Sequence, residues 1–148
     1  SAVNGLIAAH LLTADELLRI SEAKVKSILK MPLFSMIKGF ELYKEQPFTA
    51  YLPAKLTEKG YLGDEQVLVQ GIIDLLAVKG NDAIIVDYKF SSLKNDSDLI
   101  YRYEKQLRLY ALAVKKVLNK NIIGLYLANI YSARIIPLSL DFLNDAIY

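Results

Sequence analysis

Two acidic residues and a lysine stand within apolar runs in the middle of the chain. Ile84–Val86 leads directly into Asp87, Tyr88 and Lys89, and Asp74 lies thirteen positions before Asp87 in another apolar run. Because side chains alternate between the two faces of a strand, Asp87 and Lys89 leave one face and Tyr88 the other. A charge on a buried strand is costly unless it is paired or bound to a metal ion. Asp74, Asp87 and Lys89 therefore predict a divalent-cation site beside a lysine.

The predicted site suits the hydrolysis of phosphodiester bonds. Two carboxylates on neighbouring strands can hold one or two divalent ions, which polarise a phosphoryl oxygen and lower the pKa of a bound water. Lys89 would lie beside that water or the scissile phosphate, where it orients the nucleophile and stabilises negative charge. The sequence has no Cys and one His, so carboxylates and carbonyls must be the main ligands. Such ligands favour Mg²⁺, Mn²⁺ or Ca²⁺ over Zn²⁺.

Composition limits the class of protein. The 148 residues, 53% of them hydrophobic, are enough for one domain with a single packed core. A net charge of +2 gives no electrostatic sign of nucleic acid binding. The absence of Cys agrees with a reducing cytoplasm, and the apolar runs are far shorter than the roughly 20 residues of a membrane span. We therefore expect a soluble, cytoplasmic protein without a membrane partner.

The first third of the chain predicts helices followed by an edge strand. A capping box at Thr13–Glu16 and the apolar spacing after it predict a helix over residues 14–30. Pro32 ends that helix and can open a short new one through residue 38. Residues 40–52 alternate apolar with polar side chains, which predicts a strand, and Pro47 restricts this strand to a sheet edge or a bulge.

The rest of the chain predicts an α/β fold, a central mixed β-sheet flanked by helices. Lys79–Asn81 is a short turn suited to an antiparallel pair of strands, and this pairing would carry Asp74 toward Asp87. The other predicted elements are a loop over 55–65, strands over 66–78 and 82–90, a helix over 99–118, strands over 122–130 and 134–138, and a short terminal helix capped by Asp141.

Three segments resemble the successive motifs of RecB-type nucleases of the PD-(D/E)XK superfamily. They are Gly71–Asp74, Val86–Lys89 and Tyr103–Ala111. Flanking segments resemble, more narrowly, the C-terminal nuclease domain of AddA-type helicase-exonuclease subunits; they are Leu12–Thr13, Glu45–Phe48, Leu52–Ala54, Val67–Gly71 and Leu125–Leu127. The resemblance covers residues 12–138. It implies a restriction-endonuclease-like core, with residues 1–148 as one nuclease domain. We expect the chain, which starts at Ser1 without Met, to be a C-terminal fragment of a larger helicase-nuclease.

The resemblance also implies roles for individual residues. Asp74 and Asp87 match the metal ligands of the family, with the main-chain carbonyl of Tyr88 completing the coordination, and Lys89 matches its catalytic lysine. Glu45 matches an upstream acid, which we interpret as a supporting residue near the metal or the lysine. On the long predicted helix, Tyr103, Gln106 and Tyr110 share one face, and the resemblance directs that face toward the site.

Two positions depart from the family pattern. The family usually has Thr after the catalytic lysine, and this chain has Phe90, which lacks the hydroxyl. The family also supplies a metal-binding His from an upstream helix. His10 is the one candidate, yet it stands directly before residues 11–13, a segment that in the family follows the histidine helix at a distance. We therefore expect that helix to lie outside this chain, and the isolated domain to bind metal weakly and to cut poorly.

The function implied by the resemblance is a Mg²⁺-dependent DNA exonuclease module of an ATP-dependent helicase-nuclease that processes double-strand breaks. Its substrate would be single-stranded DNA; Mn²⁺ or Ca²⁺ could replace Mg²⁺ in binding, and ATP would serve only the motor. Its partners would be the helicase region of the parent chain and a second subunit. One alternative is a stand-alone nuclease or junction resolvase of the same superfamily. Another is a catalytically silent DNA-binding domain, although such relatives typically lose the acids or the lysine.

Simpler interpretations remain open for single residues. Asp87 and Lys89 could form an ordinary surface ion pair, and Glu45 could be an exposed strand charge. Gln106 and Tyr110 could belong to an ordinary amphipathic helix.

Overall fold

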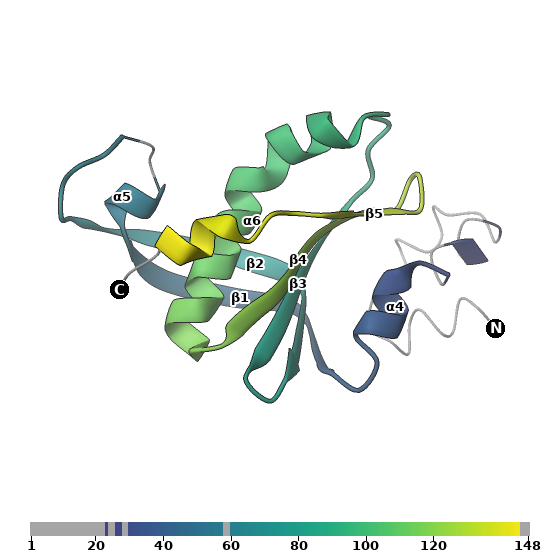
Figure 1. The fold of residues 1–148 in the computed structure, drawn as a ribbon, viewed down its shortest axis with the longest axis horizontal. Coiled ribbons are helices and arrows are strands. Elements are labelled where there is room, and N and C mark those ends of the chain that lie inside the picture. Colours follow the sequence, from purple (N-terminus) through teal and green to yellow (C-terminus); the bar gives the residue numbers. More distant parts are fainter. Residues whose placement is uncertain (1–22, 24–25, 28–29, 58–59, 146–148) are drawn as a thin grey trace.

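The structure, a computed structural model, describes residues 23, 26–27, 30–57 and 60–145. Within this part of the chain, five strands form one mixed sheet with helices on both faces (Figure 1). The strands, side by side in this order, are β1 (Glu41–Pro53), β2 (Gln66–Lys79), β3 (Asp82–Lys89), β4 (Asn121–Asn129) and β5 (Arg134–Pro137). The helices are α4 (Pro32–Met36), α5 (Ala54–Thr57), α6 (Asp96–Leu118) and the 3₁₀ helix η1 (Asp141–Asp145). The predicted α/β fold with a central mixed sheet is confirmed.

Local sequence sets the direction of each strand pair. Gly80, at φ +59°, makes the tight turn between β2 and β3, which pair antiparallel, as do β1 with β2 and β4 with β5. β3 and β4 pair in parallel, so the chain must cross over between them, and α6 is that crossover. α6 ends at Asn119, whose φ of +53° is a left-handed conformation in which many helices stop. β1 lies at the sheet edge, where Pro47 is tolerated.

Each face of the sheet has its own apolar core. On the face covered by α6, called the α6 face below, Leu107 packs with Ile85 of β3. On the opposite face, where α4 lies (Figure 1) and which is called the α4 face below, Leu33 packs with Val86. β3 is apolar and buried toward both faces, as expected for a central strand. Its odd-numbered residues face α6, so the strand directs Asp87 toward the α6 face.

One predicted helix boundary was wrong, and one short helix was not predicted, each for a local reason. The long helix begins at Asp96 rather than at residue 99, because its first turn is polar and carries Asp96 and Asp98, which the helix dipole stabilises. Apolar periodicity does not mark such a turn. In the region predicted as a loop over 55–65, α5 forms because Ala54 is buried and Leu56 packs against an apolar cluster.

The ends of the chain differ from the prediction in other ways. The short terminal helix is 3₁₀, and Asp141 is its first residue rather than its cap. Most of the predicted helix over 14–30 lies outside the described residues, and so does His10. None of the helices in the described part of the chain is both long enough and apolar enough to cross a membrane.

Candidate functional site

The regular alternation of side chains between the two faces is interrupted at Asp74. Ile73 and Leu76 both pack on the α6 face, whereas Leu75 packs on the α4 face. The β1–β2 ladder lacks a pair at the same place, where Glu45 stands opposite Asp74 with a left-handed φ of +50°. Irregularities of this kind turn a side chain out of the ladder and are common beside active sites. The interruption therefore explains why the Asp74 side chain leaves the regular β1–β2 ladder.

The released Asp74 carboxylate binds the backbone of β3. Its Oδ2 accepts a hydrogen bond of 2.8 Å from the N–H of Tyr88, just beyond the last β2–β3 pair, Leu75 with Val86. Burial raises the pKa of Asp74 from its ordinary 3.8 to about 7; the hydrogen bond opposes this rise, and the negative charge of Asp87 adds to it. A carboxyl group that titrates near neutral pH is typical of functional sites.

Asp87 and Lys89 form an ion pair at the end of β3. Lys89 Nζ lies 2.9 Å from Asp87 Oδ2, as the alternation of side chains predicts. Asp87 is only 3% exposed, and its Oδ2 forms no hydrogen bond of good geometry with any described residue. Lys89 is therefore its electrostatic partner. Asp74 also interacts with Asp87, whose negative charge raises the pKa of Asp74, so two acids share one ammonium here, an arrangement that a divalent cation would stabilise.

Three residues of α6 complete the site. Lys89 Nζ lies 4.2 Å from the centroid of the Tyr103 ring. Three residues further along, Gln106 Nε2 donates a hydrogen bond of 2.8 Å to Tyr110 Oη. Burial raises the pKa of the Tyr110 phenol, and the negative charge of Asp87 raises it further, so Tyr110 lies within electrostatic reach of that acid. The structure thus brings the two acids and the lysine of the sheet together with the predicted residues of α6.

The donor atoms at this site fit a hard divalent cation. Asp74 and Asp87 offer carboxylate oxygens from neighbouring strands, and Tyr88 has a main-chain carbonyl next to Asp87. Among the described residues, no group of three or more His, Cys, Asp and Glu side chains gathers, so an ion held here would keep several waters. Mg²⁺ binds in this way, through one or two carboxylates together with waters and substrate phosphates.

Comparison with known protein families agrees with the fold and with this chemistry. The profile of the PD-(D/E)XK nuclease superfamily matches residues 7–136. The chain belongs to this superfamily. Its mixed five-stranded sheet with helices is consistent with the α/β fold of PD-(D/E)XK nucleases, so the predicted fold class and family are confirmed.

The similar proteins include AddA-type subunits of bacterial ATP-dependent helicase/nucleases. The chain is 29% identical over 141 residues to the protein of Clostridium perfringens, an alignment that covers 84% of the chain and 11% of the relative. It is 30% identical over 132 residues to that of Pelotomaculum thermopropionicum, covering 86% and 10%. For Desulforamulus reducens the identity is 40% over 88 residues, covering 57% and 7%. This PD-(D/E)XK nuclease domain is therefore related to AddA-type proteins and spans about a tenth of their length.

An aromatic pair positions Tyr110 in the nuclease domain. The rings of Phe48 and Tyr110 pack edge to face, with centroids 5.2 Å apart and an interplanar angle of 76°. A Cβ on Gly71 would lie 2.9 Å from Phe48 Cε1 and 3.0 Å from Tyr110 Cε1, too close for ordinary packing. Glycine at the start of the Gly71–Asp74 motif therefore makes room for these rings, which sequence reasoning did not foresee.

Asn129 holds the loop that follows Lys89 in the nuclease domain, and sequence reasoning missed it. Asn129 is 2% exposed. Its Nδ2 donates to Ser91 O at 3.0 Å, and its Oδ1 accepts from Ser91 N and Tyr131 N, both at 3.2 Å. The β3–β4 register pairs Asn129 with Lys89. No signal in the sequence marks Asn129, because its partners come together only when β3 and β4 pair in parallel.

Three residues singled out in the sequence do not join the cluster. Glu45 is exposed, and its side chain forms no hydrogen bond or ion pair with the described residues, so its supporting role stays a prediction. Phe90 is 50% exposed directly after Lys89. His10 lies outside the described residues, so its role as a ligand also stays untested.

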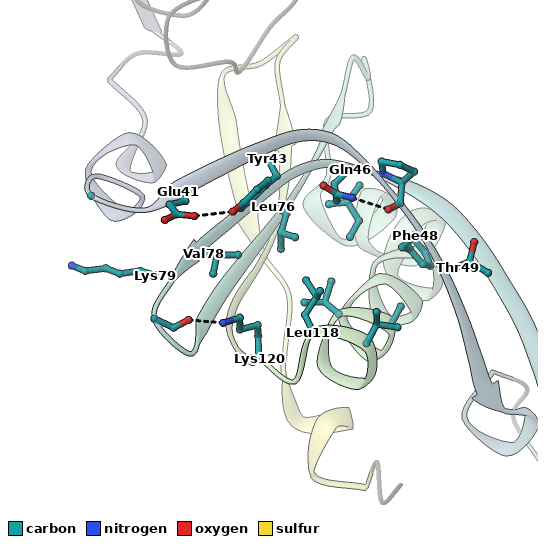
Figure 2. Close-up of a pocket in the computed structure, with 17 residues that line it drawn as sticks. Glu41, Tyr43, Gln46, Phe48, Thr49, Leu76, Val78, Lys79, Leu118 and Lys120 are labelled. Carbon is teal, nitrogen blue, oxygen red and sulfur yellow. Dashed lines mark hydrogen bonds between the residues drawn. The ribbon is translucent and has the colours of Figure 1, made fainter.

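A cavity of about 780 Å³ lies beside the candidate site but does not include it. Mostly apolar side chains of β1, β2 and the C-terminal half of α6 line it, and charged groups, among them Lys79 and Lys120, lie toward one end (Figure 2). Asp74, Asp87 and Lys89 are not among its lining residues. The charged cluster at the end of β3 is therefore separate from this cavity.

Proposed function

We propose that this chain is the Mg²⁺-dependent exonuclease module of an ATP-dependent helicase-nuclease and that it hydrolyses phosphodiester bonds of single-stranded DNA. The observation that carries the chemistry is the cluster of Asp74, Asp87 and Lys89 at the end of β3. In this proposal the parent chain supplies the helicase region, and ATP serves only that motor. A second subunit completes a cytoplasmic complex that processes double-strand breaks for recombination repair. Relatives named as helicase/nuclease subunits support this association.

The proposed metal ligands are Asp74, Asp87 and the carbonyl of Tyr88. Nucleases of this superfamily generally use divalent metal ions. When bound, Mg²⁺ would supply positive charge to a phosphate oxygen and lower the pKa of a water. The preference for Mg²⁺ over softer metals is supported by the oxygen-only donor set.

In the proposed mechanism, Lys89 stabilises the negative charge that develops on the phosphate. An ammonium has three N–H donors, and Lys89 lies beside Asp87 as an ion pair. Its N–H groups can be donated to phosphate oxygens, where a preorganised cation lowers the barrier. Tyr110 Oη accepts a hydrogen bond from Gln106, so its own proton can be donated toward the acids or the substrate.

The alternatives have less support. The similar proteins are named as helicase/nuclease subunits, which favours the helicase-associated module over a stand-alone nuclease or resolvase. A catalytically silent DNA-binding domain would have little reason to retain Asp74, Asp87 and Lys89 in contact.

The proposal is tested by cleavage of fluorescently labelled single-stranded DNA with Mg²⁺, measured on the full helicase-nuclease parent chain because the isolated domain is expected to cut poorly. Asp87→Asn and Lys89→Met should each lower the rate about a hundredfold or more, and EDTA should abolish it. Asp82→Asn is the matched control, because Asp82 lies on the same strand five residues away, about 16 Å along β3. If Asp87→Asn cuts as fast as the parent chain while both are folded by circular dichroism, the proposed active site is wrong.

A further inference from the structure

The ammonium of Lys89 lies between two groups from different elements. Nζ is 2.9 Å from Asp87 Oδ2 and 4.2 Å from the centroid of the Tyr103 ring. The carboxylate shares β3 with the lysine, whereas the ring belongs to α6. A lysine stem is long and flexible, so the ion pair alone would let Nζ swing around the carboxylate. The ring supplies the second point of contact that fixes its position.

An aromatic ring can hold an ammonium without cancelling its charge. The face of a Tyr ring attracts cations through its quadrupole, but the ring has no net charge. A second carboxylate in place of Tyr103 would neutralise the positive charge that an anionic phosphate must meet. The Lys89 side chain is 21% exposed, so the ammonium is held by the ring and the acid yet still open to a ligand.

We infer that Tyr103 is a positioning residue for Lys89, and that the face of its ring directs the ammonium toward the scissile phosphate. This inference rests on the proposed nuclease function. The ring, rather than the hydroxyl, carries the role. Tyr103 also packs against the apolar cluster of the α6 face, and the guanidinium of Arg102 lies 5.5 Å from the same ring. Phe at this position keeps all of these contacts, whereas Leu keeps only the apolar packing.

The contact can be measured without any activity. Protons above the face of an aromatic ring resonate upfield, so the ε-methylene protons of Lys89 should lie upfield of those of the other lysines in a ¹³C-resolved NMR spectrum. Lys89→Met identifies the resonance by its loss. Tyr103→Phe should keep the upfield position, and Tyr103→Leu should move the resonance to the ordinary lysine position. An unchanged Lys89 resonance in Tyr103→Leu would overturn the inference.

The effect on the reaction is measured on single-stranded DNA with Mg²⁺. Tyr103→Leu should lower kcat about five- to thirtyfold, the size of a partly desolvated cation–π contact, with KM unchanged within about twofold. Tyr103→Phe should keep kcat. The matched control is Tyr51→Leu, because Tyr51 is 60% exposed and lies six positions along β1 from Glu45, about 20 Å away.

A double-mutant cycle separates positioning from structural support. In the Lys89→Met background the ring has no cation to hold, so adding Tyr103→Leu should cause no further loss of rate. Suppose instead that Tyr103→Leu lowers the rate as much in the Lys89→Met background as it does when Lys89 is present. Tyr103 would then only support the fold, and the inference would be overturned. Thermal unfolding of each variant confirms that the compared proteins are folded.

The inference and the proposed function fail in different ways. If the parent chain shows no cleavage that depends on Asp87, the proposed function fails and the inference fails with it. If the parent chain cleaves and Tyr103→Leu cleaves equally fast, only the inference fails.

Discussion

Metal binding should weaken steeply below pH 7, because it requires the ionised form of Asp74. Burial raises the pKa of this carboxyl from 3.8 to about 7, and a carboxyl group must lose its proton before it binds a cation. With that pKa, about a tenth of the molecules are ionised at pH 6 and about nine tenths at pH 8. The affinity for Mg²⁺ should therefore fall about tenfold from pH 8 to pH 6.

Isothermal titration calorimetry at several pH values measures this effect. At pH 7, titration in buffers of different ionisation enthalpy should show about half a proton released per ion bound. Asp74→Asn should bind Mg²⁺ more weakly and lose the pH dependence, whereas Asp82→Asn, a control on β3, should keep both. Equal affinity at pH 6 and pH 8, with no proton release, would refute the assignment of Asp74 as a titrating ligand.

The same pKa fixes how the stability of the metal-free protein depends on pH. Between pH 3.8 and about 7, folded Asp74 keeps a proton that the unfolded chain releases. The free energy of unfolding should therefore fall as the pH rises through this window. Asp74→Asn should lack this contribution, and Mg²⁺ should restore stability at pH 8 by binding the folded state. Urea unfolding at a series of pH values, with and without Mg²⁺, measures both effects.

Further predictions concern groups around the site and are checked by urea unfolding. Lys89→Met leaves buried Asp87 without its partner and should cost about 2 to 4 kcal/mol in metal-free protein; Asp87→Asn in the same chain should restore most of this, and no recovery would contradict the ion pair. Gly71→Ala places a Cβ 2.9 Å from Phe48 Cε1 and should cost about 1 to 3 kcal/mol, partly recovered by Phe48→Leu. Asn129→Leu removes three hydrogen bonds to the backbone of Ser91 and Tyr131 and should cost about 1 to 3 kcal/mol; no measurable loss would show that the loop needs no such support.

The sheet and the Asp87–Lys89 pair could be predicted because their causes are local. Apolar alternation marks strands, the Gly80 turn fixes the direction of a hairpin, and a period of two places Asp87 and Lys89 on one face. The helical spacing of Gln106 and Tyr110 likewise predicts a common face. Each of these features depends on residues near one another in the chain.

The rest of the site depends on pairings between distant segments. Nothing in the sequence shows that Lys89 and Asn129 stand side by side, because that requires the parallel register of β3 and β4. Whether Lys89 meets Tyr103 or another residue of the same helix face depends on how α6 crosses the sheet. Helical spacing alone would also allow Gln106 or Tyr110.

One backbone irregularity links the two halves of the site. Before it, β1 packs Leu42 on the α4 face; after it, the strand packs Phe48 on the α6 face, although both residues are even-numbered. An unbroken ladder would send Phe48 to the α4 face, away from Tyr110. The left-handed backbone of Glu45 therefore has two consequences. The Asp74 side chain lies outside the regular ladder, and Phe48 faces α6, where its ring packs against Tyr110.

Glu45 should accordingly act through its backbone rather than through its carboxylate. A left-handed φ of +50° costs ordinary residues about 1 to 2 kcal/mol and glycine almost nothing. Glu45→Gly should therefore keep Mg²⁺ affinity and fold stability, whereas Glu45→Val, with its β-branched side chain, should lower both. Calorimetry and urea unfolding measure the two quantities, and Glu45→Gln separates charge from shape. If the Glu45→Gly and Glu45→Gln variants both bind Mg²⁺ more weakly while the stability of each is unchanged, the carboxylate itself supports the metal site, as the family resemblance implies.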